Sequence, residues 1–371
     1  MLLLRVNLKA QRACGRVWAM RGVALAVVAG LALGGATARA ETIGGALIKA
    51  YFNNPDINQQ RAAVRVADEG VPKATAGYRP TVTAEGDAGV QQLEAAVPNA
   101  GGLPGVPSQP RGYGLTISET LWNGNRTFNG VRQAESQVMQ ARETLRNTEQ
   151  NVLLSAVTYY MDVLRDTAIL ELDRNNVDVL QEQLRQTRDR FTVGEVTRTD
   201  VAQAEASLAG AQATALQAQS TLQTSIANYR QTIGDQPKNL APVKSLEKPL
   251  PKTLAEAIAI SQVEHPAIVG SLHGVDAAQL QIKIAEGALY PTVGLTGQVN
   301  QRFDETGQTV PNHILTASLV AQVNIPIYDG GATFSTIRQA KARSIQSSSS
   351  IERQSRGLET AAVVNGCGRD K

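Results

Sequence analysis

The sequence has few of the residues from which enzymes build their active sites. Phe, Trp and Tyr make up 4% of its 371 residues, there are three histidines, and the two cysteines are Cys14 and Cys367. His265 and His273 are eight residues apart, which is not the spacing of a zinc-binding helix. A Gly-rich phosphate loop, a nucleophile elbow and a cysteine pair are all missing from the sequence. We therefore predict a protein that is not an enzyme, with no catalytic residues, no cofactor and no metal site.

Long apolar runs are missing after residue 40. Residues 1–40 have the pattern of a signal peptide, with five basic residues in the first 21, then an apolar stretch from Val23 to Gly35 and a small-x-small motif at Ala38–Ala40. An uncleaved membrane anchor is the alternative, although this stretch is short for a bilayer. Beyond it, no continuous apolar stretch reaches about 20 residues, so entry into a membrane would require β-strands.

The net charge changes sign once this segment is set aside. The chain has 36 Lys and Arg against 33 Asp and Glu, and residues 1–40 hold six of the basic residues and no acid. The mature chain then has 30 basic and 33 acidic residues, a net charge of −3, which argues against nucleic acid as a partner. Because only Cys367 would remain, an intramolecular disulfide is excluded.

What the sequence does contain is an internal repeat. Tyr78–Val82 returns as Leu289–Val293 after about 211 residues, and Phe128–Ala134 returns as Phe334–Ala340 after about 206. A repeat of this length indicates a whole subdomain used twice. The first predicted repeat covers 41–240 and contains short helices, a β-hairpin at 81–122 and a long helical hairpin at 129–233. The second covers 241–364 and contains short helices, a β-hairpin at 292–328 and the start of a long helix.

Both predicted β-hairpins alternate between apolar and polar residues. In the first, Val82, Ala84 and Val90 share one face. The opposite face carries residues that we expect to line a water-filled lumen: Thr83, Glu85, Asp87, Thr116, Ser118, Thr296, Gln298, Thr316 and Gln322. One apolar and one polar face is typical of a membrane barrel with a wet lumen. A soluble, half-buried sheet gives the same alternation and remains open.

A long helical tract lies between the hairpins. Its apolar residues repeat at three- and four-residue spacing over 129–191, roughly 95 Å of helix, and again over 201–229, which predicts a coiled-coil hairpin. An ordinary amphipathic bundle shares the spacing. In the turn between the two runs, Gly194 suits a helix end, and Thr199 or Asp200 suits the cap of the returning helix, with Gln203 completing a capping box. A plain helical hairpin turn is the alternative.

The order of these elements resembles the TolC-like outer-membrane efflux protein family. The resemblance covers residues 42 to about 364 and rests on Arg190–Gly194, Thr199–Val201, Tyr290–Pro291 and Ile325–Gly331. It implies a mainly α fold with β, in which four strands from each of three chains form a 12-stranded barrel in the outer membrane of a Gram-negative bacterium. The helices would continue into the periplasm as a tunnel.

The same resemblance implies a function and partners. Members of the family serve as passive conduits in tripartite efflux or type I secretion, and their helical tips dock a periplasmic adaptor that couples them to an inner-membrane pump. The residues that would contact the adaptor are Val193, Gly194, Glu195, Val196, Arg198, Thr199 and Asp200. The pump would select the substrate, so drug efflux, protein export and metal export all fit the sequence.

The second repeat departs from the family pattern. Its helix begins as expected at residues 336–340, but the seam weakens and ends near Val364, and residues 365–371 are expected to be aberrant and disordered. By the repeat period, roughly 70 residues would be absent, which predicts a truncated channel that is inactive alone. The alternative function is a periplasmic coiled-coil scaffold or adaptor, which accounts for residues 129–233 but not for the four strands.

Overall fold

The computed structural model describes residues 41–93, 106–243, 253–303 and 313–366, so the predicted signal peptide lies outside the described residues. The chain forms two compact units. In the described residues, the first unit consists of 41–46, 160–230 and 235–243, and the second of 47–93, 106–159, 231–234, 253–303 and 313–366. Within these ranges, no helix combines the length and the apolar character needed to cross a membrane.

In each repeat, short helices precede the strands, and their starts follow from local sequence. The first repeat has α2 (Ile43–Asn53), α3 (Pro55–Asp68), α4 (Gly70–Thr75) and the short 3-10 helix η1 (Ala76–Tyr78), whereas the second has α7 (Leu254–Glu264) and α8 (Pro266–Gly287). Asn54 caps α3 because its Oδ1 accepts from the backbone N–H of Asp56 at 2.8 Å. His265 caps α8 through Nδ1, which accepts from Ala267 N at 3.2 Å. Both caps precede a proline, which is well suited to the first helical position.

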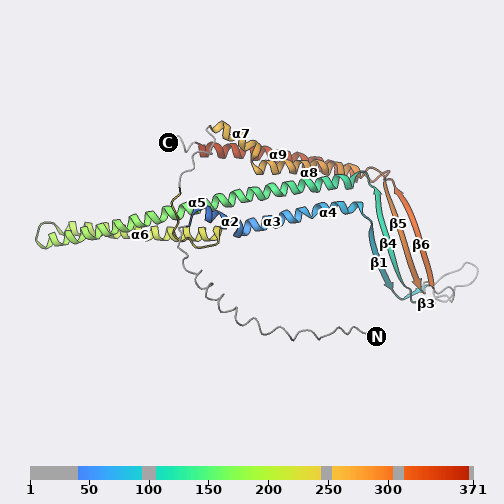
Figure 1. Ribbon diagram of the computed structural model, residues 1–371, viewed down its shortest axis with the longest axis horizontal. Coiled ribbons are helices and arrows are strands. Elements are labelled where there is room, and N and C mark those ends of the chain that lie inside the picture. The colour runs from blue at the N-terminus through green and yellow to red at the C-terminus, as the bar shows by residue number, and fades with distance from the viewer. Residues whose placement is uncertain (1–40, 94–105, 244–252, 304–312, 367–371) are drawn as a thin grey trace, which may run out of the picture. The chain divides into compact units, whose positions relative to one another are not determined.

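The long helices begin and end close to the predicted positions. α5 (Arg126–Thr192) has 67 residues and starts three residues before the predicted start, and α6 (Arg198–Ile233) returns after the turn. α9 (Ala332–Gly366) lies beside α8 (Figure 1), with Ala285, Ile337 and Ala340 buried between them. α9 includes residues 365 and 366, where we expected the helix to be lost, and residues 367–371 lie outside the described part of the chain.

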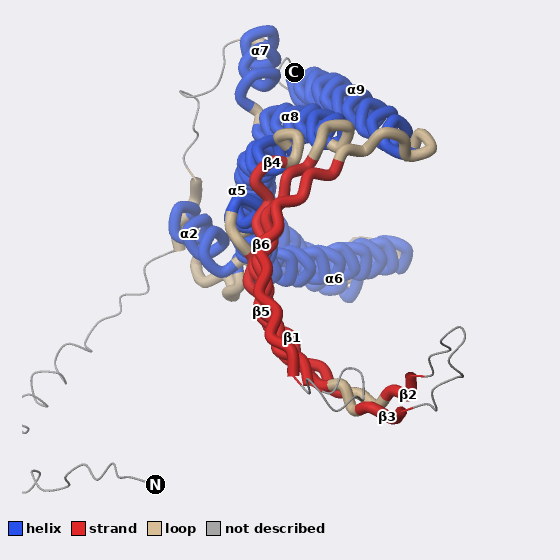
Figure 2. Tube along the Cα trace, turned by 90° about the vertical axis from the view of Figure 1, so that its right-hand side faces the viewer, coloured by secondary structure: helices blue, strands red, loops and turns tan. Residues whose placement is uncertain are grey.

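Four strands form one antiparallel sheet. β1 (Thr81–Ala88), β4 (Arg111–Trp122), β5 (Thr292–Phe303) and β6 (His313–Asn324) follow the order β1-β4-β5-β6 (Figure 1). From its edge, the sheet is a single curved layer (Figure 2), and the short pair β2 (Gln91–Leu93) and β3 (Val106–Ser108) lies at the end farthest from the helices.

The last strand is shorter than predicted. We expected the second hairpin to extend to Tyr328, but β6 ends at Asn324, which pairs with Thr292, the first residue of β5. Beyond this point Pro326 has no backbone N–H to donate to a ladder, so the segment 325–328 leaves the sheet.

Buried tyrosines and a buried carboxylate hold the first unit together. Tyr160 and Tyr229 are fully buried with ring centroids 6.4 Å apart, and the Tyr160 hydroxyl lies 2.8 Å and 2.7 Å from the carbonyl oxygens of Glu41 and Ala241. Burial raises the pKa of both phenols, so they stay neutral. Through Tyr160, α5 thus contacts the first and the last segment of this unit, residues 41–46 and 235–243.

Asp166 is the buried carboxylate of this unit, only 3% exposed. Its Oδ2 accepts from Ser225 Oγ on α6 at 2.6 Å, and its Oδ1 accepts from Arg165 Nε at 2.9 Å. Burial opposes ionisation, but these hydrogen bonds outweigh it, so the pKa of Asp166 is below its usual value. The charged side chain therefore links the two helices of the hairpin.

Candidate functional site

The strand register gathers the predicted lumen residues on one face of the sheet. Directly paired residues of antiparallel strands point to the same side. Thr83 pairs with Thr116, and Thr116 pairs in turn with Gln298 on the next strand. The same register places all nine predicted residues together: Thr83, Glu85, Asp87, Thr116, Ser118, Thr296, Gln298, Thr316 and Gln322. We call this side the polar face.

Arg302 and Asn300, which are not among the nine predicted lumen residues, also lie on the polar face. Arg302 Nη1 lies 3.5 Å from Asp87 Oδ2, although β4 runs between their strands. The ion pair can cross because Gly112, which lies between the two residues, has no side chain. Asn300 lies over Gly114 in the same way, since a Cβ at Gly114 would come within 2.0 Å of its Oδ1. Alternating glycines on one strand were the sequence signal for this arrangement.

The opposite side of the sheet is apolar and exposed. Val82, Ile117, Gly297 and Leu319 form one cross-strand row on this face. Large side chains here are open to solvent: Leu319 is 73% exposed and Tyr113 is 65% exposed. Within the described residues of the second unit, no α-helix packs against this face. A contiguous exposed apolar surface of this kind indicates contact with lipid or another apolar partner.

The sheet also has two open edges. β1 and β6 are the outer strands, and each pairs on one side only within the described residues. Unpaired backbone groups along an edge strand favour pairing with another chain.

At the end of the helical hairpin, four of the seven predicted tip residues, Val193 to Val196, lie in the turn between α5 and α6, and the other three, Arg198 to Asp200, lie in the first turn of α6. Gly194 has a φ of +80°, and its N–H donates to Phe191 O at 3.0 Å, which ends α5. Arg190 Nη2 lies 2.8 Å from Glu195 Oε1, and this neighbour lowers the pKa of Glu195. Val193 is 78% exposed. The turn is thus closed by hydrogen bonds and an ion pair of its own, and the apolar side chain of Val193 is exposed.

The start of α6 corrects one prediction. Neither Thr199 nor Asp200 is the cap; Thr197 is, because α6 starts at Arg198. Thr197 N donates to Asp200 Oδ2 at 2.8 Å, and Thr197 Oγ1 accepts from Asp200 N at 3.4 Å. This reciprocal pair has the geometry of a capping box with aspartate in the third helical position, and it leaves Gln203 with no capping role.

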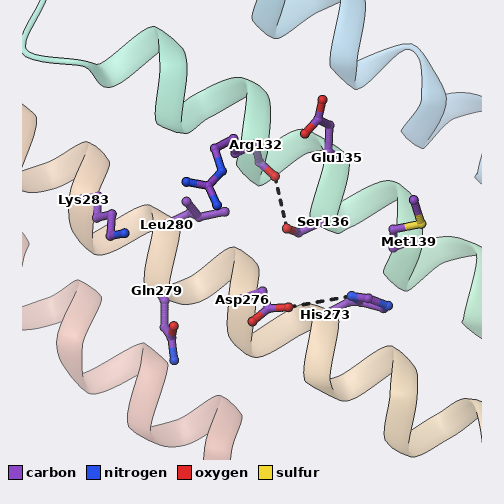
Figure 3. A pocket seen from close by; sticks show the side chains of 9 residues that line it. All are labelled: Arg132, Glu135, Ser136, Met139, His273, Asp276, Gln279, Leu280 and Lys283. Carbon is purple, nitrogen blue, oxygen red and sulfur yellow. Dashed lines mark hydrogen bonds and ion pairs between the residues drawn. The ribbon is translucent and has the colours of Figure 1, made fainter.

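A hollow of about 440 Å³ lies between α5 and α8 (Figure 3). Side chains of both charges line it, including Arg132, Glu135 and Lys283. His273 Nδ1 lies 3.8 Å from Asp276 Oδ2, and both side chains are partly exposed. Among the described residues, no three His, Cys, Asp or Glu side chains come together as a metal site would require.

Comparisons with known proteins agree with this architecture. Outer membrane efflux protein BepC of Brucella suis biovar 1 is 41% identical over 319 residues, which are 86% of this chain and 67% of BepC. Outer membrane protein TolC of Vibrio cholerae serotype O1 is 25% identical over 245 residues, 64% of this chain and 56% of that protein. The chain thus spans about two thirds of BepC and just over half of this TolC.

A solved structure shares the fold. The Campylobacter jejuni CmeC outer membrane channel matches with a TM-score of 0.72 at 17% identity, over 84% of this chain and 67% of that one. The predicted fold class, mainly helical with a four-stranded antiparallel sheet, is confirmed. The sequence profile of the outer membrane efflux protein family matches residues 47–235 and 258–365. The chain therefore belongs to the outer membrane efflux protein family, as its tip and strand residues led us to expect.

Proposed function

We propose that this protein is the outer-membrane channel component of a tripartite efflux or type I secretion system in a Gram-negative bacterium. It would act as a passive conduit from the periplasm to the exterior and not as an enzyme. One observation carries the proposal: the four-stranded sheet exposes one apolar face and one polar face, and helices meet it at one end only. A sheet of this kind gains stability when its apolar side meets lipid and its polar side meets water.

A homotrimer would complete the sheet. Three copies bring twelve strands, and pairing β6 of one copy with β1 of the next would leave no free edge, as a structure within lipid requires. β4, β5 and β6 are long enough for this role, because their 12 residues extend roughly 40 Å and a tilted barrel needs an apolar band of about 25 Å. β1 is shorter, with eight residues. The nine predicted lumen residues and Arg302 would then face the pore.

The helical tip would bind the periplasmic adaptor that couples the channel to an inner-membrane pump. The predicted contact residues lie within residues 193–200, in the turn and the first turn of α6, where Arg190 pairs with Glu195 and Thr197 forms a capping box with Asp200. The exposed side chain of Val193 would give the adaptor an apolar contact at this tip.

Fractionation of cells that express the full chain tests the proposal. We expect the protein in the outer-membrane fraction, with a band on a denaturing gel that migrates differently before and after heating. A folded protein recovered in the soluble periplasmic fraction would contradict the proposal and would favour the coiled-coil scaffold instead.

A further inference from the structure

The apolar face of the sheet carries a positive charge at the end farthest from the helices (Figure 2). Arg111 lies opposite Phe303, and Phe303 lies opposite His313, so the three side chains form one row on this face. The Cζ atom of Arg111 is 5.9 Å from the centre of the Phe303 ring, and the His313 ring centre is 6.5 Å from it. Asp87, the acidic residue of β1 near this row, is on the polar face and pairs with Arg302. A guanidinium group and an imidazole are therefore held beside one aromatic ring.

The next row toward the helices also carries polar groups. Tyr113 lies opposite Gln301 on the same face, and its ring centroid is 6.3 Å from that of Phe303. A phenol hydroxyl and a side-chain amide can both donate hydrogen bonds to carbonyl oxygens. Such carbonyls, in ester or amide linkages, lie directly below the phosphates of a membrane lipid. Inward from the end, this face therefore becomes less polar in the same order as a lipid molecule.

Farther along the same face there is an apolar hollow of about 400 Å³. Its lining includes Gly297 and four apolar side chains around it: Leu115, Ile117, Val299 and Leu319. A Cβ at Gly297 would come no closer than 3.5 Å to Leu319 Cδ1, which is an ordinary contact, so a side chain would fit here. Glycine within a strand weakens it because it has no side chain to pack. Packing among the described residues therefore does not require this glycine, and its effect is to leave the hollow open.

The two glycines of β4 on the polar face differ in this respect. A Cβ at Gly114 would lie 2.0 Å from Asn300 Oδ1, and one at Gly112 would lie 3.0 Å from Gln301 O. Neighbouring atoms thus occupy the space beside both residues. The hollow at Gly297 is a different case, because space remains there for a ligand.

The distance between the charged row and the hollow matches one leaflet of a bilayer. Phe303 and Gly297 are six residues apart on β5, which is roughly 20 Å along the strand. At the tilt of about 40° that strands have in membrane barrels, this is roughly 15 Å along the membrane normal, half of a hydrocarbon core of about 30 Å. An acyl chain of a lipid whose phosphate lies at Arg111 would therefore end at the hollow.

Aromatic side chains at the two ends of this face support the same depth. Trp122 is nine residues from Tyr113 on β4, roughly 30 Å along the strand, and at the same tilt this spans close to the apolar band of about 25 Å that aromatic girdles flank. Glu119 is on this face too, but it is three residues from Trp122 and so lies near the opposite end from Arg111. Because the proposed function places the helices in the periplasm, the end with Arg111 belongs to the outer leaflet.

We propose that this face of β4, β5 and β6 binds a phosphorylated, acylated glycolipid, the kind of lipid that forms the outer leaflet of a Gram-negative outer membrane. Arg111 would bind a phosphate with two parallel hydrogen bonds, and the imidazole of His313 can donate a third. One acyl chain would lie along β5 and end in the hollow at Gly297. β4 and β5 are the central strands, so the site lies away from the sheet's edges. This inference rests on the proposed outer-membrane function and adds a lipid that the channel would recognise by its charge.

Lipid binding by the full chain in detergent micelles tests the site. The probe is lipid A with two phosphates, and native mass spectrometry measures the fraction of protein that carries it at a series of lipid concentrations. The first test variant is Arg111→Gln, and its matched control is Arg302→Gln, which removes the same charge from the polar face at the same end of the sheet. The second test variant, Gly297→Leu, fills the hollow, and its control, Gly294→Leu, adds the same side chain to the polar face of the same strand.

We expect Arg111→Gln to raise the dissociation constant about tenfold and Gly297→Leu about threefold, with little change in either control. Equal losses in Arg111→Gln and Arg302→Gln would overturn the phosphate site, and unchanged binding by Gly297→Leu would overturn the place of the acyl chain. Release of the lipid by an excess of inorganic phosphate would show that the site takes a free anion, which also contradicts the proposal.

A comparison of lipids needs no variant and separates this inference from the proposed function. The parent protein should bind lipid A with two phosphates at least fivefold more tightly than the dephosphorylated lipid. Equal binding of the two lipids by a protein that is found in the outer membrane would overturn the lipid site alone. A parent that binds neither lipid and stays folded in buffer without detergent would overturn both the site and the proposed function.

Discussion

The helical hairpin and the β-sheet differ in how far their side chains are buried within one chain. In the hairpin, Tyr160, Tyr229 and Asp166 are buried and hydrogen-bonded or packed within the chain. In the sheet, large apolar side chains such as Leu319 are exposed, and both edges are open in the described residues. The difference teaches that the buried contacts of the hairpin lie within one chain, whereas the apolar face of the sheet would be covered only in the proposed lipid-embedded trimer.

Truncation of one side chain in each region should give the largest difference in unfolding free energy between the hairpin and the sheet. We expect Tyr229→Ala to lower the free energy of unfolding by about 3–5 kcal/mol, because it leaves a cavity at a fully buried site. Leu319→Ala should change it by no more than about 0.5 kcal/mol, because its side chain is already exposed. Urea unfolding of the monomer, followed by far-UV circular dichroism, measures both. Equal losses would show that the sheet has a core of its own.

Two turns that lead from strand to helix, residues 123–125 between β4 and α5 and residues 329–331 before α9, offer a finer test within the sheet region. Gly124→Ala meets both an unfavourable positive φ and the carbonyl oxygen of Gly287, so we expect a loss of about 3 kcal/mol in unfolding free energy. Gly330→Ala has the same φ and open space, so a loss of about 1 kcal/mol is expected in the monomer. Thermal unfolding of the two variants measures both losses of unfolding free energy. A larger loss at Gly330 than at Gly124 would contradict the expected difference in packing between the two turns.

The stability of the hairpin should depend on pH through Asp166. Its pKa is lower in the folded protein than in the unfolded chain, so its contribution to stability is present above the unfolded pKa of about 4 and is lost as pH falls through the folded pKa. Unfolding of the parent and of Asp166→Asn at a series of pH values measures this. Identical acid dependence in both would show that another carboxyl group is responsible.

At the tip, we expect a substitution to have little effect on stability but to weaken adaptor binding. Val193→Asp should change the unfolding free energy by less than about 0.5 kcal/mol, because the side chain is 78% exposed. We expect it to weaken adaptor binding at least tenfold by placing a charge in an apolar contact. Leu216→Asp, at an exposed position on α6 away from the tip, is the matched control. Equal binding by both variants would contradict the tip as the docking site.

The faces of the sheet could be predicted from sequence because alternation is a local property. Thr83, Thr116 and Gln298 are far apart in the chain, yet each was assigned to its face from its immediate neighbours alone. The contact of Gly124 with Gly287 could not be predicted in this way, since it depends on how α8 and β4 come together. The burial of Asp166 could not be predicted from the sequence either, because a charged residue on a long helix is normally solvated.

The most direct test of the central claim is the environment of β6 in a lipid bilayer. Nitroxide labels placed one at a time at residues 315–322 would report collisions with oxygen, which dissolves in lipid, and with a water-soluble nickel complex. We predict a period of two, with oxygen collisions dominant at Leu315, Ala317, Leu319 and Ala321 and nickel collisions dominant at Thr316, Ser318, Val320 and Gln322. High nickel accessibility at all eight positions would contradict the claim that lipid and water complete the two faces of this sheet.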